Sequence, residues 1–305
     1  MLPKRRLRLY EITWLVSSRY SGSNMKIASF YSVDGEDFGI VSGDGIISLK
    51  KRLPATKGSL RAAIANGLTA DLGRIAADAK PDLLIEDVKF APVIPSPNKF
   101  IAVGINYRDH AQQIERKVEA FPGIFVRFPD SLVGHLQPMI RPRISTQFDF
   151  EGELALIIGK RGRYIAEDHA MQYVAGYTCF VDGSLRDYQK LATTAGKNFP
   201  STGPFGPWMV TADEIPDPGR MVLTTRLNGL VVQHAGVDEM IHSIPKIISY
   251  ISQFTELRPG DVISTGTPGG VGHRRNPPIW LKSGDTLEFE ISGIGILSNP
   301  IVDEA

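Results

Sequence analysis

The sequence predicts an α+β fold dominated by strands, with a small N-terminal α/β unit followed by a larger β-rich unit. Short β-prone runs alternate with hairpin-type turns such as Asp34-Gly35 and Asn228-Gly229. A proline-marked connection at residues 91–97 separates two stretches of the chain, and only one clear amphipathic helix interrupts the later strands. We therefore expect units at residues 25–95 and 96–305.

Residues 1–24 differ from the rest of the chain. They carry several basic side chains but lack the clean apolar stretch and cleavage site of a secretory signal. Met25 is followed at once by a β-prone run, as at a natural start. We expect residues 1–24 to be a disordered leader or the product of an upstream translation start, in preference to a targeting segment.

The first unit should contain three strands and two short helices. Ser59 is placed to cap a helix over residues 60–65, and Thr69 to cap a second one over residues 70–77. The strands are expected at 26–31, 38–42 and 45–49.

The second unit should begin with a strand at 99–104, followed by a polar segment, 106–116, that is expected to form a short surface helix. Ser243 is suited to cap the one clear helix, and Pro245 fits its first turn. The apolar face of this helix would consist of Ile244, Ile247, Ile248 and Ile251.

Two glutamates one residue apart stand at the head of the apolar run 154–158, which has the composition of a buried strand. Side chains at positions i and i+2 of a strand point to the same side, so Glu151 and Glu153 would project together. Burying both without a partner is costly, and a cation that prefers oxygen ligands would hold them there. The alternative is an edge strand whose glutamates face water.

A third ligand could follow the β-prone run 177–181. Asp182 stands where such a strand would deliver a carboxylate into a site. Asp187 lies five residues further on and could equally pair with Arg186 or a lysine. Three carboxylates would leave coordination positions open, as a catalytic cation requires.

Other chemical groups are ambiguous in isolation. The segment 264–272 could be a carboxylate-binding loop or a plain glycine-rich turn. Lys197 taken alone is predicted to be a solvated surface cation, and the charged neighbours of His110 indicate an exposed helix. The histidines lack zinc-ligand spacing, and no motif of a serine hydrolase or a dinucleotide enzyme is present.

Composition excludes several classes. The chain has 34 Lys and Arg against 33 Asp and Glu, so nothing in its charge favours nucleic acid or an anionic membrane. No stretch is long and apolar enough to span a bilayer. The single cysteine, Cys179, excludes an intrachain disulfide, is expected to be a buried thiol, and fits a reducing cytoplasm.

The order of seven blocks resembles the fumarylacetoacetate hydrolase family. The resemblance covers residues 96–305, and residues 25–95 are similar to the small N-terminal domain of many members. The blocks are 103–110, 149–155, 181–189, 196–199, 206–208, 259–263 and 265–268. The resemblance implies a catalytic domain of mixed β-roll or β-sandwich type.

The resemblance also implies an acylpyruvase-like activity. A metal-dependent hydrolase of this kind would cleave a C–C bond in a β-diketo acid, such as an acylpyruvate or fumarylpyruvate, and release pyruvate or a related enolate during the breakdown of aromatic compounds. Mg²⁺ or Mn²⁺, replaceable by Ca²⁺ in a crystal, would be held by Glu151, Glu153 and Asp182. A homodimer is implied as well.

Further site residues are implied by the same matches. Lys197 matches the active-site lysine, and His110 matches a histidine on a mobile lid that activates water. The substrate-contacting positions would be Arg127, where many members have lysine, together with Arg186, Gln189 and Thr267.

Gln113 departs from the hydrolytic pattern. Members that hydrolyse acylpyruvates commonly carry glutamate three residues after the lid histidine, and glutamine cannot stabilise an imidazolium as a carboxylate does. A decarboxylase of oxaloacetate-like 2-oxo acids or a hydroxymuconate isomerase is therefore the alternative, because neither reaction needs an activated water. A binding protein without turnover is disfavoured by the intact Glu151, Glu153, Asp182 and Lys197.

Overall fold

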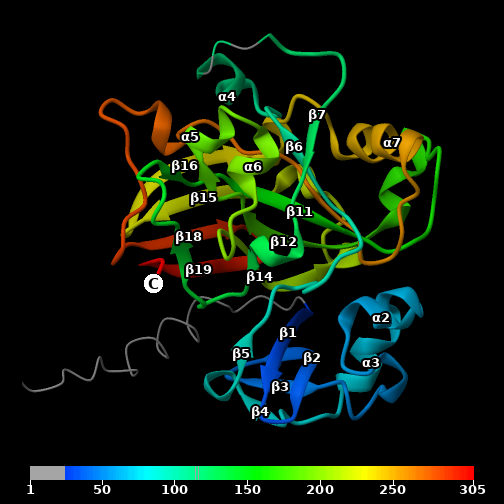
Figure 1. Cartoon of the computed structure of the whole chain (residues 1–305). Coiled ribbons are helices and arrows are strands. Elements are labelled where there is room, and N and C mark those ends of the chain that lie inside the picture. The colour runs from blue at the N-terminus through cyan, green and yellow to red at the C-terminus, as the bar shows by residue number, and fades with distance from the viewer. Residues whose placement is uncertain (1–24, 114, 116) are drawn as a thin grey trace, which may run out of the picture.

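The computed structural model describes residues 25–305 except 114 and 116. The expectation for residues 1–24 falls outside the described residues. A small unit formed by the N-terminal part of the chain lies beneath a larger β-rich unit (Figure 1). The expectation of a β-dominated mixed fold is confirmed.

The first unit contains the predicted strands and the first predicted helix. Ser59 caps that helix, since its hydroxyl accepts a hydrogen bond from the backbone N–H of Ala62. The expected cap at Thr69 is wrong, because Thr69 lies inside a 3₁₀ turn, Leu68–Asp71, and the next helix begins only after it. The elements are β1 (Lys26–Ser32), β2 (Gly35–Ser42), β3 (Gly45–Ser48), α2 (Leu60–Ala65), α3 (Leu72–Ala76), β4 (Leu83–Leu84) and β5 (Lys89–Phe90).

The larger unit is built mainly from strands, with four short or medium helices. Its strands are β6 (Phe100–Gly104), β7 (Gly123–Val126), β8 (Leu132–Val133), β9 (Met139–Arg141), β10 (Phe148–Asp149), β11 (Gly152–Ile158), β12 (Val174–Val181), β13 (Ser184–Leu185), β14 (Gly203–Thr211), β15 (Val222–Leu227), β16 (Leu230–Gly236), β17 (Val262–Ser264), β18 (Thr286–Ile291) and β19 (Gly295–Asp303). Its helices are α4 (Arg108–Gln113), α5 (Arg186–Gln189), α6 (Thr193–Lys197) and α7 (Ile244–Phe254).

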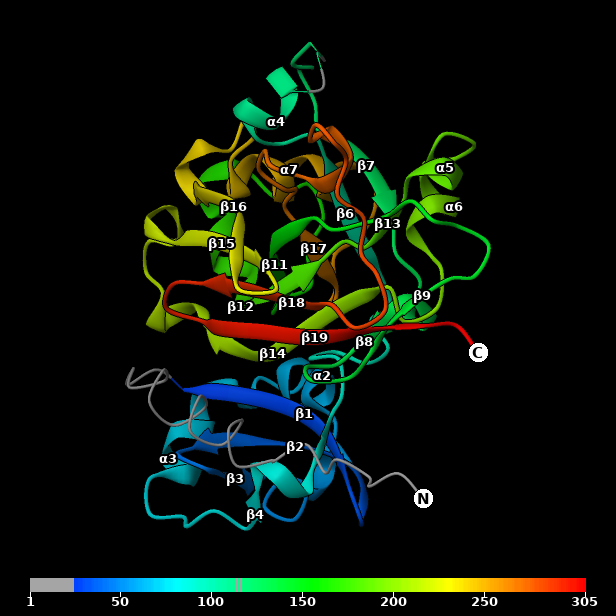
Figure 2. The ribbon, with the colours of Figure 1, turned by 90° about the vertical axis from the view of Figure 1, so that its left-hand side faces the viewer.

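One long sheet runs through both units. Its main path is β4-β3-β2-β1-β14-β12-β11-β17-β6-β7, and β1 joins β14 through the antiparallel pairs Lys26↔Val210 and Ile27↔Met209. Figure 2 shows β1 lying beside β14 at the junction of the units. A second sheet has the order β16-β15-β18-β19-β9. The small unit is therefore attached through the central sheet of the larger one.

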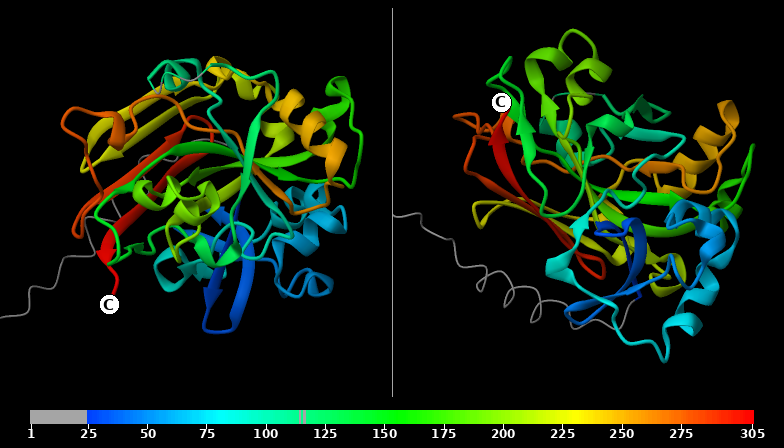
Figure 3. Two further views of the ribbon diagram at one scale, coloured as in Figure 1. Left: turned by 45° about the horizontal axis from the view of Figure 1, so that its top comes forward. Right: turned by 60° about the horizontal axis from the view of Figure 1, so that its bottom comes forward.

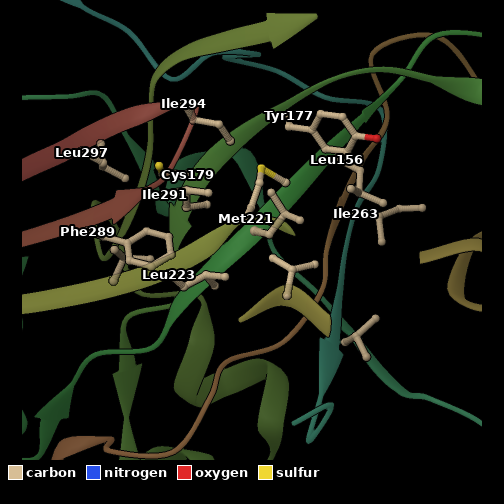
Figure 4. Packing of buried hydrophobic residues seen from close by; sticks show 14 of the residues in the cluster. Leu156, Tyr177, Cys179, Met221, Leu223, Ile263, Phe289, Ile291, Ile294 and Leu297 are labelled. Carbon is tan, nitrogen blue, oxygen red and sulfur yellow. The ribbon is translucent and has the colours of Figure 1, made fainter. Parts of the chain in front are cut away.

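The main core lies between these two sheets. Figure 3 shows the yellow and red strands β15, β16, β18 and β19 as a layer beside the green strands β11 and β12. Leu156 and Tyr177 of the first sheet meet Leu223 and Phe289 of the second in this layer (Figure 4). Cys179 is fully buried there, as predicted, and burial raises the pKa of its thiol.

Helix α7 follows its sequence pattern. The Ser243 hydroxyl accepts a hydrogen bond from the backbone N–H of Lys246, and all four isoleucines of the predicted apolar face are buried. At the opposite side of the larger unit, α4, α5 and α6 lie over the ends of the central strands (Figure 1). In the described part of the chain, no helix is long and apolar enough to cross a membrane.

Candidate metal centre and substrate cavity

Three carboxylates meet where β11 begins and β12 ends. The two strands are antiparallel neighbours with the pair Gly152↔Val181, so Asp182 comes directly beside Glu151 and donates its backbone N–H to the Glu151 carbonyl at 2.8 Å. Glu151 and Glu153 point to the same side, and one oxygen from each of the three carboxylates lies within 4.8 Å of the others. All three side chains are buried.

Three cationic side chains surround this cluster. The Lys197 ammonium contacts a Glu151 oxygen and lies 2.5 Å from Asp182 Oδ2. Arg127 Nη1 lies 2.7 Å from Asp182 Oδ1, and Arg186 Nη2 lies 2.7 Å from Glu151 Oε1. The reading of Lys197 as a surface cation is wrong, because its carboxylate partners come from strands distant in the sequence and leave it only 1% exposed.

The charges of the cluster do not balance without a further cation. In the described part of the chain, the four carboxylates Asp149, Glu151, Glu153 and Asp182 lie among three permanent cations, Arg127, Arg186 and Lys197. His273 also contacts Asp149, so one excess negative charge remains when the carboxylates are ionised and His273 is neutral.

This excess falls on Glu153. Burial, with the nearby Asp182 and Glu151, raises the pKa of Glu153 well above its usual range. Burial alone would also raise the pKa of Glu151, but Arg186 and Lys197 hold the pKa of Glu151 below its usual range. Buried, convergent oxygen donors with uncompensated charge fit a hard divalent cation.

The cluster forms part of the wall of a cavity of about 500 Å³. Glu151 and Glu153 line it, together with residues from α4, α5, α6 and the loop after β17. The remaining polar residues on its wall include His110, Gln189, Lys190, Thr267, His273 and Arg274. The cavity is therefore rich in hydrogen-bond donors and positive charge beside the carboxylates.

Helix α4 covers the cavity with a buried histidine. The expectation that His110 is exposed is wrong, because α4 packs on the loop after β17. The backbone N–H of Gly269 donates to Asp109 at 2.8 Å, and that of Gly270 donates to Gln113 Oε1 at 3.2 Å. Burial lowers the pKa of His110. Among the described residues, the buried Nδ1 of His110 has no hydrogen-bond partner.

The other candidate residues occupy different places around the centre. Arg127 lies behind Asp182 with a fully buried side chain and does not line the cavity. Gln189 Oε1 accepts from Arg186 Nη1 at 2.8 Å, so both reach the cavity from α5. The Thr267 hydroxyl already donates to the Gly152 carbonyl at 2.9 Å. Asp187, the alternative ligand, instead accepts a hydrogen bond from Ser145 at 2.8 Å.

Three residues that contribute to the site were not predicted from the sequence. Gln233 joins β11 to the following loop, since its Oε1 accepts from the Gly152 backbone N–H and its Nε2 donates to the Thr267 hydroxyl. Asp149 pairs with Arg186, and His273 lines the cavity while contacting Asp149. A signal for Asp149 was present, because it continues the alternate spacing of Glu151 and Glu153.

The fold and the carboxylate cluster define a class of β-rich proteins with a buried acidic cluster that could hold a divalent cation, on the wall of a polar cavity. The model of the fumarylacetoacetate (FAA) hydrolase C-terminal domain matches residues 99–302. This chain belongs to the fumarylacetoacetate hydrolase family, whose members include tautomerases, isomerases and hydrolases.

Relatives and solved structures agree with this assignment. The mitochondrial oxaloacetate tautomerase of Rattus norvegicus is 37% identical over 288 residues, covering 92% of each chain. The maleylpyruvate hydrolase of Sphingobium sp. SYK-6, solved with manganese(II) and pyruvate, is 28% identical with a TM-score of 0.78, covering 92% of this chain and 100% of that one. The 2-hydroxyhepta-2,4-diene-1,7-dioate isomerase of Mycobacterium marinum is 31% identical with a TM-score of 0.71, covering 92% and 99%.

Proposed function

We propose that this chain interconverts the keto and enol forms of a small 2-oxo acid of the oxaloacetate type, using a divalent cation held by Glu151, Glu153 and Asp182. The observation that carries the proposal is the buried carboxylate cluster with one uncompensated charge on the wall of a cationic cavity. The name of the rat relative, an oxaloacetate tautomerase, supports the same reaction class.

The charges on the cavity wall suit a substrate with two carboxylates. Arg186 is shared between Asp149 and Glu151, and Lys197 between Glu151 and Asp182, so both are neutralised by the protein. Lys190 and Arg274 also line the cavity, and neither forms an ion pair with another described residue. They are the groups we expect to attract an anionic substrate.

Mg²⁺ or Mn²⁺ in the carboxylate cluster would stabilise the negative charge that develops on the 2-oxo oxygen. The protein groups keep the cluster in place: Lys197 holds Glu151 and Asp182 together, and Arg127 fixes Asp182 from behind. Gln189 and Arg186 lie side by side at the cavity and can donate to a bound carboxylate.

Hydrolysis of a C–C bond in an acylpyruvate is the second candidate. It is favoured by the similarity to a maleylpyruvate hydrolase and by the position of His110 at the cavity. It would need His110 to activate water and to carry the resulting charge. Among the described residues no carboxylate accepts a hydrogen bond from His110 Nδ1, and Gln113 Oε1 accepts the backbone N–H of Gly270, which favours enolisation over hydrolysis.

The test compares three reactions on the same protein with Mg²⁺ or Mn²⁺. Enolisation is followed by the ultraviolet absorbance of the enol of oxaloacetate, hydrolysis by pyruvate released from acylpyruvates, and decarboxylation by CO₂ released from oxaloacetate. We expect enolisation to be the fastest and to be lost in Glu153→Ala but not in Glu167→Gln, an exposed carboxylate outside the cavity. Full activity of Glu153→Ala would overturn the assignment.

Three further expectations remain predictions. A homodimer would be seen as a doubled mass of the 33.5 kDa chain in sedimentation experiments. A cytoplasmic location and a part in the breakdown of aromatic compounds would be tested in the cells that make the protein.

A further inference from the structure

Two histidines line the cavity, and their surroundings differ. His110 has a buried Nδ1 without a hydrogen-bond partner among the described residues. His273 follows the loop after β17, and its Nδ1 lies 2.9 Å from Asp149 Oδ2. An acid–base histidine needs a partner that fixes its tautomer and carries part of its charge, so the two rings are unequal candidates for proton transfer.

Asp149 is fitted to hold His273. Its buried carboxylate accepts the backbone N–H groups of Gly272 at 2.8 Å and His273 at 3.1 Å, and Arg186 Nε at 2.8 Å. Two backbone N–H groups and a guanidinium donate to this carboxylate, an arrangement that suits its ionised form. An ionised carboxylate accepts the proton on Nδ1 and leaves Nε2 of His273 as the free ring nitrogen.

The backbone at His273 is closely fitted to the same carboxylate. A Cβ atom at Gly272 would lie 2.6 Å from Asp149 Oδ1 and 2.1 Å from the Ile279 carbonyl oxygen, so only glycine allows this approach. The loop therefore holds His273 at the cavity wall in one position, with little reorganisation left for the reaction.

We propose that His273, oriented by Asp149, is the residue that transfers the proton during enolisation; this inference rests on the proposed function. Nε2 takes a proton from the carbon next to the 2-oxo group, the C–H electron pair forms the C=C bond, and the C=O π pair moves onto oxygen. The imidazolium returns that proton to the oxygen, which gives the enol and neutral His273. His273 is thus the catalytic residue and Asp149 a positioning residue.

The first test is exchange of the substrate protons for deuterium, measured by NMR in the metal-loaded protein with a panel of 2-oxo acids. We expect His273→Gln to slow exchange by about 100-fold or more, the range of general acid–base catalysis, while His110→Gln has a smaller effect. His169→Gln, at an exposed site, serves as the control. Binding of oxalate, a mimic of the enolate, should stay within about threefold of the wild type, since proton transfer is not part of binding.

The outcomes separate the two proposals. Rapid exchange in the wild type and in His273→Gln overturns the role of His273 and leaves the proposed function standing. An absence of exchange in the wild type with every 2-oxo acid overturns both.

The second test begins with a measurement that does not depend on activity, the position of the proton on the His273 ring. In the metal-free protein labelled with ¹⁵N-histidine, the His273 signals, identified by their loss in His273→Gln, should show the proton on Nδ1. In Asp149→Asn we expect the proton to move toward Nε2 and kcat to fall more than substrate affinity, which a purely structural role would not produce. A proton on Nε2 in the wild type would overturn the proposed dyad.

Discussion

Glu153→Gln tests the charge imbalance from which the metal site was inferred. Folded-state burial and the neighbouring Asp182 and Glu151 raise the pKa of Glu153 above its ordinary value of 4.5. A group with a raised folded-state pKa contributes stability that is fully present below its unfolded pKa and is lost as the pH rises through the folded pKa. The metal-free wild type should therefore lose stability relative to Glu153→Gln as the pH rises through this window.

The size of the effect follows from one proton. Within the window the difference in unfolding free energy changes by about 1.4 kcal/mol per pH unit. For a chain of this size, that corresponds to about 2 °C in Tm per pH unit. The glutamine keeps the volume and hydrogen-bonding capacity of the side chain but cannot ionise, so its own curve should lack this component.

The assay is thermal unfolding of both proteins from about pH 5 to about pH 8 in the presence of a chelator. Addition of Mg²⁺ at the upper end should raise the Tm of the wild type and leave Glu153→Gln nearly unchanged. Glu167→Gln, at an exposed site, should follow the wild type throughout. If the wild-type and Glu153→Gln curves run parallel across the whole range, the excess charge does not lie on Glu153 and the reasoning fails.

Three further changes test other parts of the structure. Arg127→Met removes a buried partner of Asp182 and should lower the unfolding free energy, measured by chemical denaturation, by about 3–5 kcal/mol. A loss below about 1 kcal/mol would contradict the buried pairing. Gln113→Glu can still accept the N–H of Gly270 and adds a carboxylate near the lid, so we expect faster pyruvate release from acylpyruvates; no gain on any of them would argue against a hydrolytic lid. Ser243→Ala removes the cap of α7 and should cost about 1 kcal/mol, with an unchanged unfolding free energy as the contrary result.

Local patterns were sufficient for much of the fold. The turn Asn228-Gly229 joins β15 to β16 as expected, with both residues at positive φ. The Ser243 cap and the apolar face of α7 could also be predicted, because helix caps and 3.6-residue periodicity depend on neighbours in the sequence. Thr69 shows the limit: a capping residue is also suited to a 3₁₀ turn, and the sequence alone does not distinguish the two.

Local patterns predicted site residues only where these lie on or beside a predicted strand, as Glu151, Glu153 and Asp182 do. Alternation alone predicted that Glu151 and Glu153 point to the same side. The prediction that Lys197 is a surface cation was wrong, because its partners Glu151 and Asp182 lie at the ends of two different strands. His273 follows Asp149 by more than a hundred residues, and no local pattern links them. Its role depends on the loop after β17 returning to the strand that carries the carboxylates.

Three carboxylates at alternate positions of one segment have similar side chains but different surroundings. Asp149, Glu151 and Glu153 follow one another at a spacing of two, and the three differ in how their charges are compensated. Asp149 is neutralised by Arg186 and holds His273, Glu151 is shared by Arg186 and Lys197, and Glu153 has no cation of its own among the described residues. Glu153, the carboxylate with the least compensation, is the one that most requires a metal ion, whereas Asp149, which is compensated by Arg186, is free to orient a base. The carboxylate that orients a proton-transfer group and the carboxylates of a cation site can therefore lie on one segment without competing for the same charge.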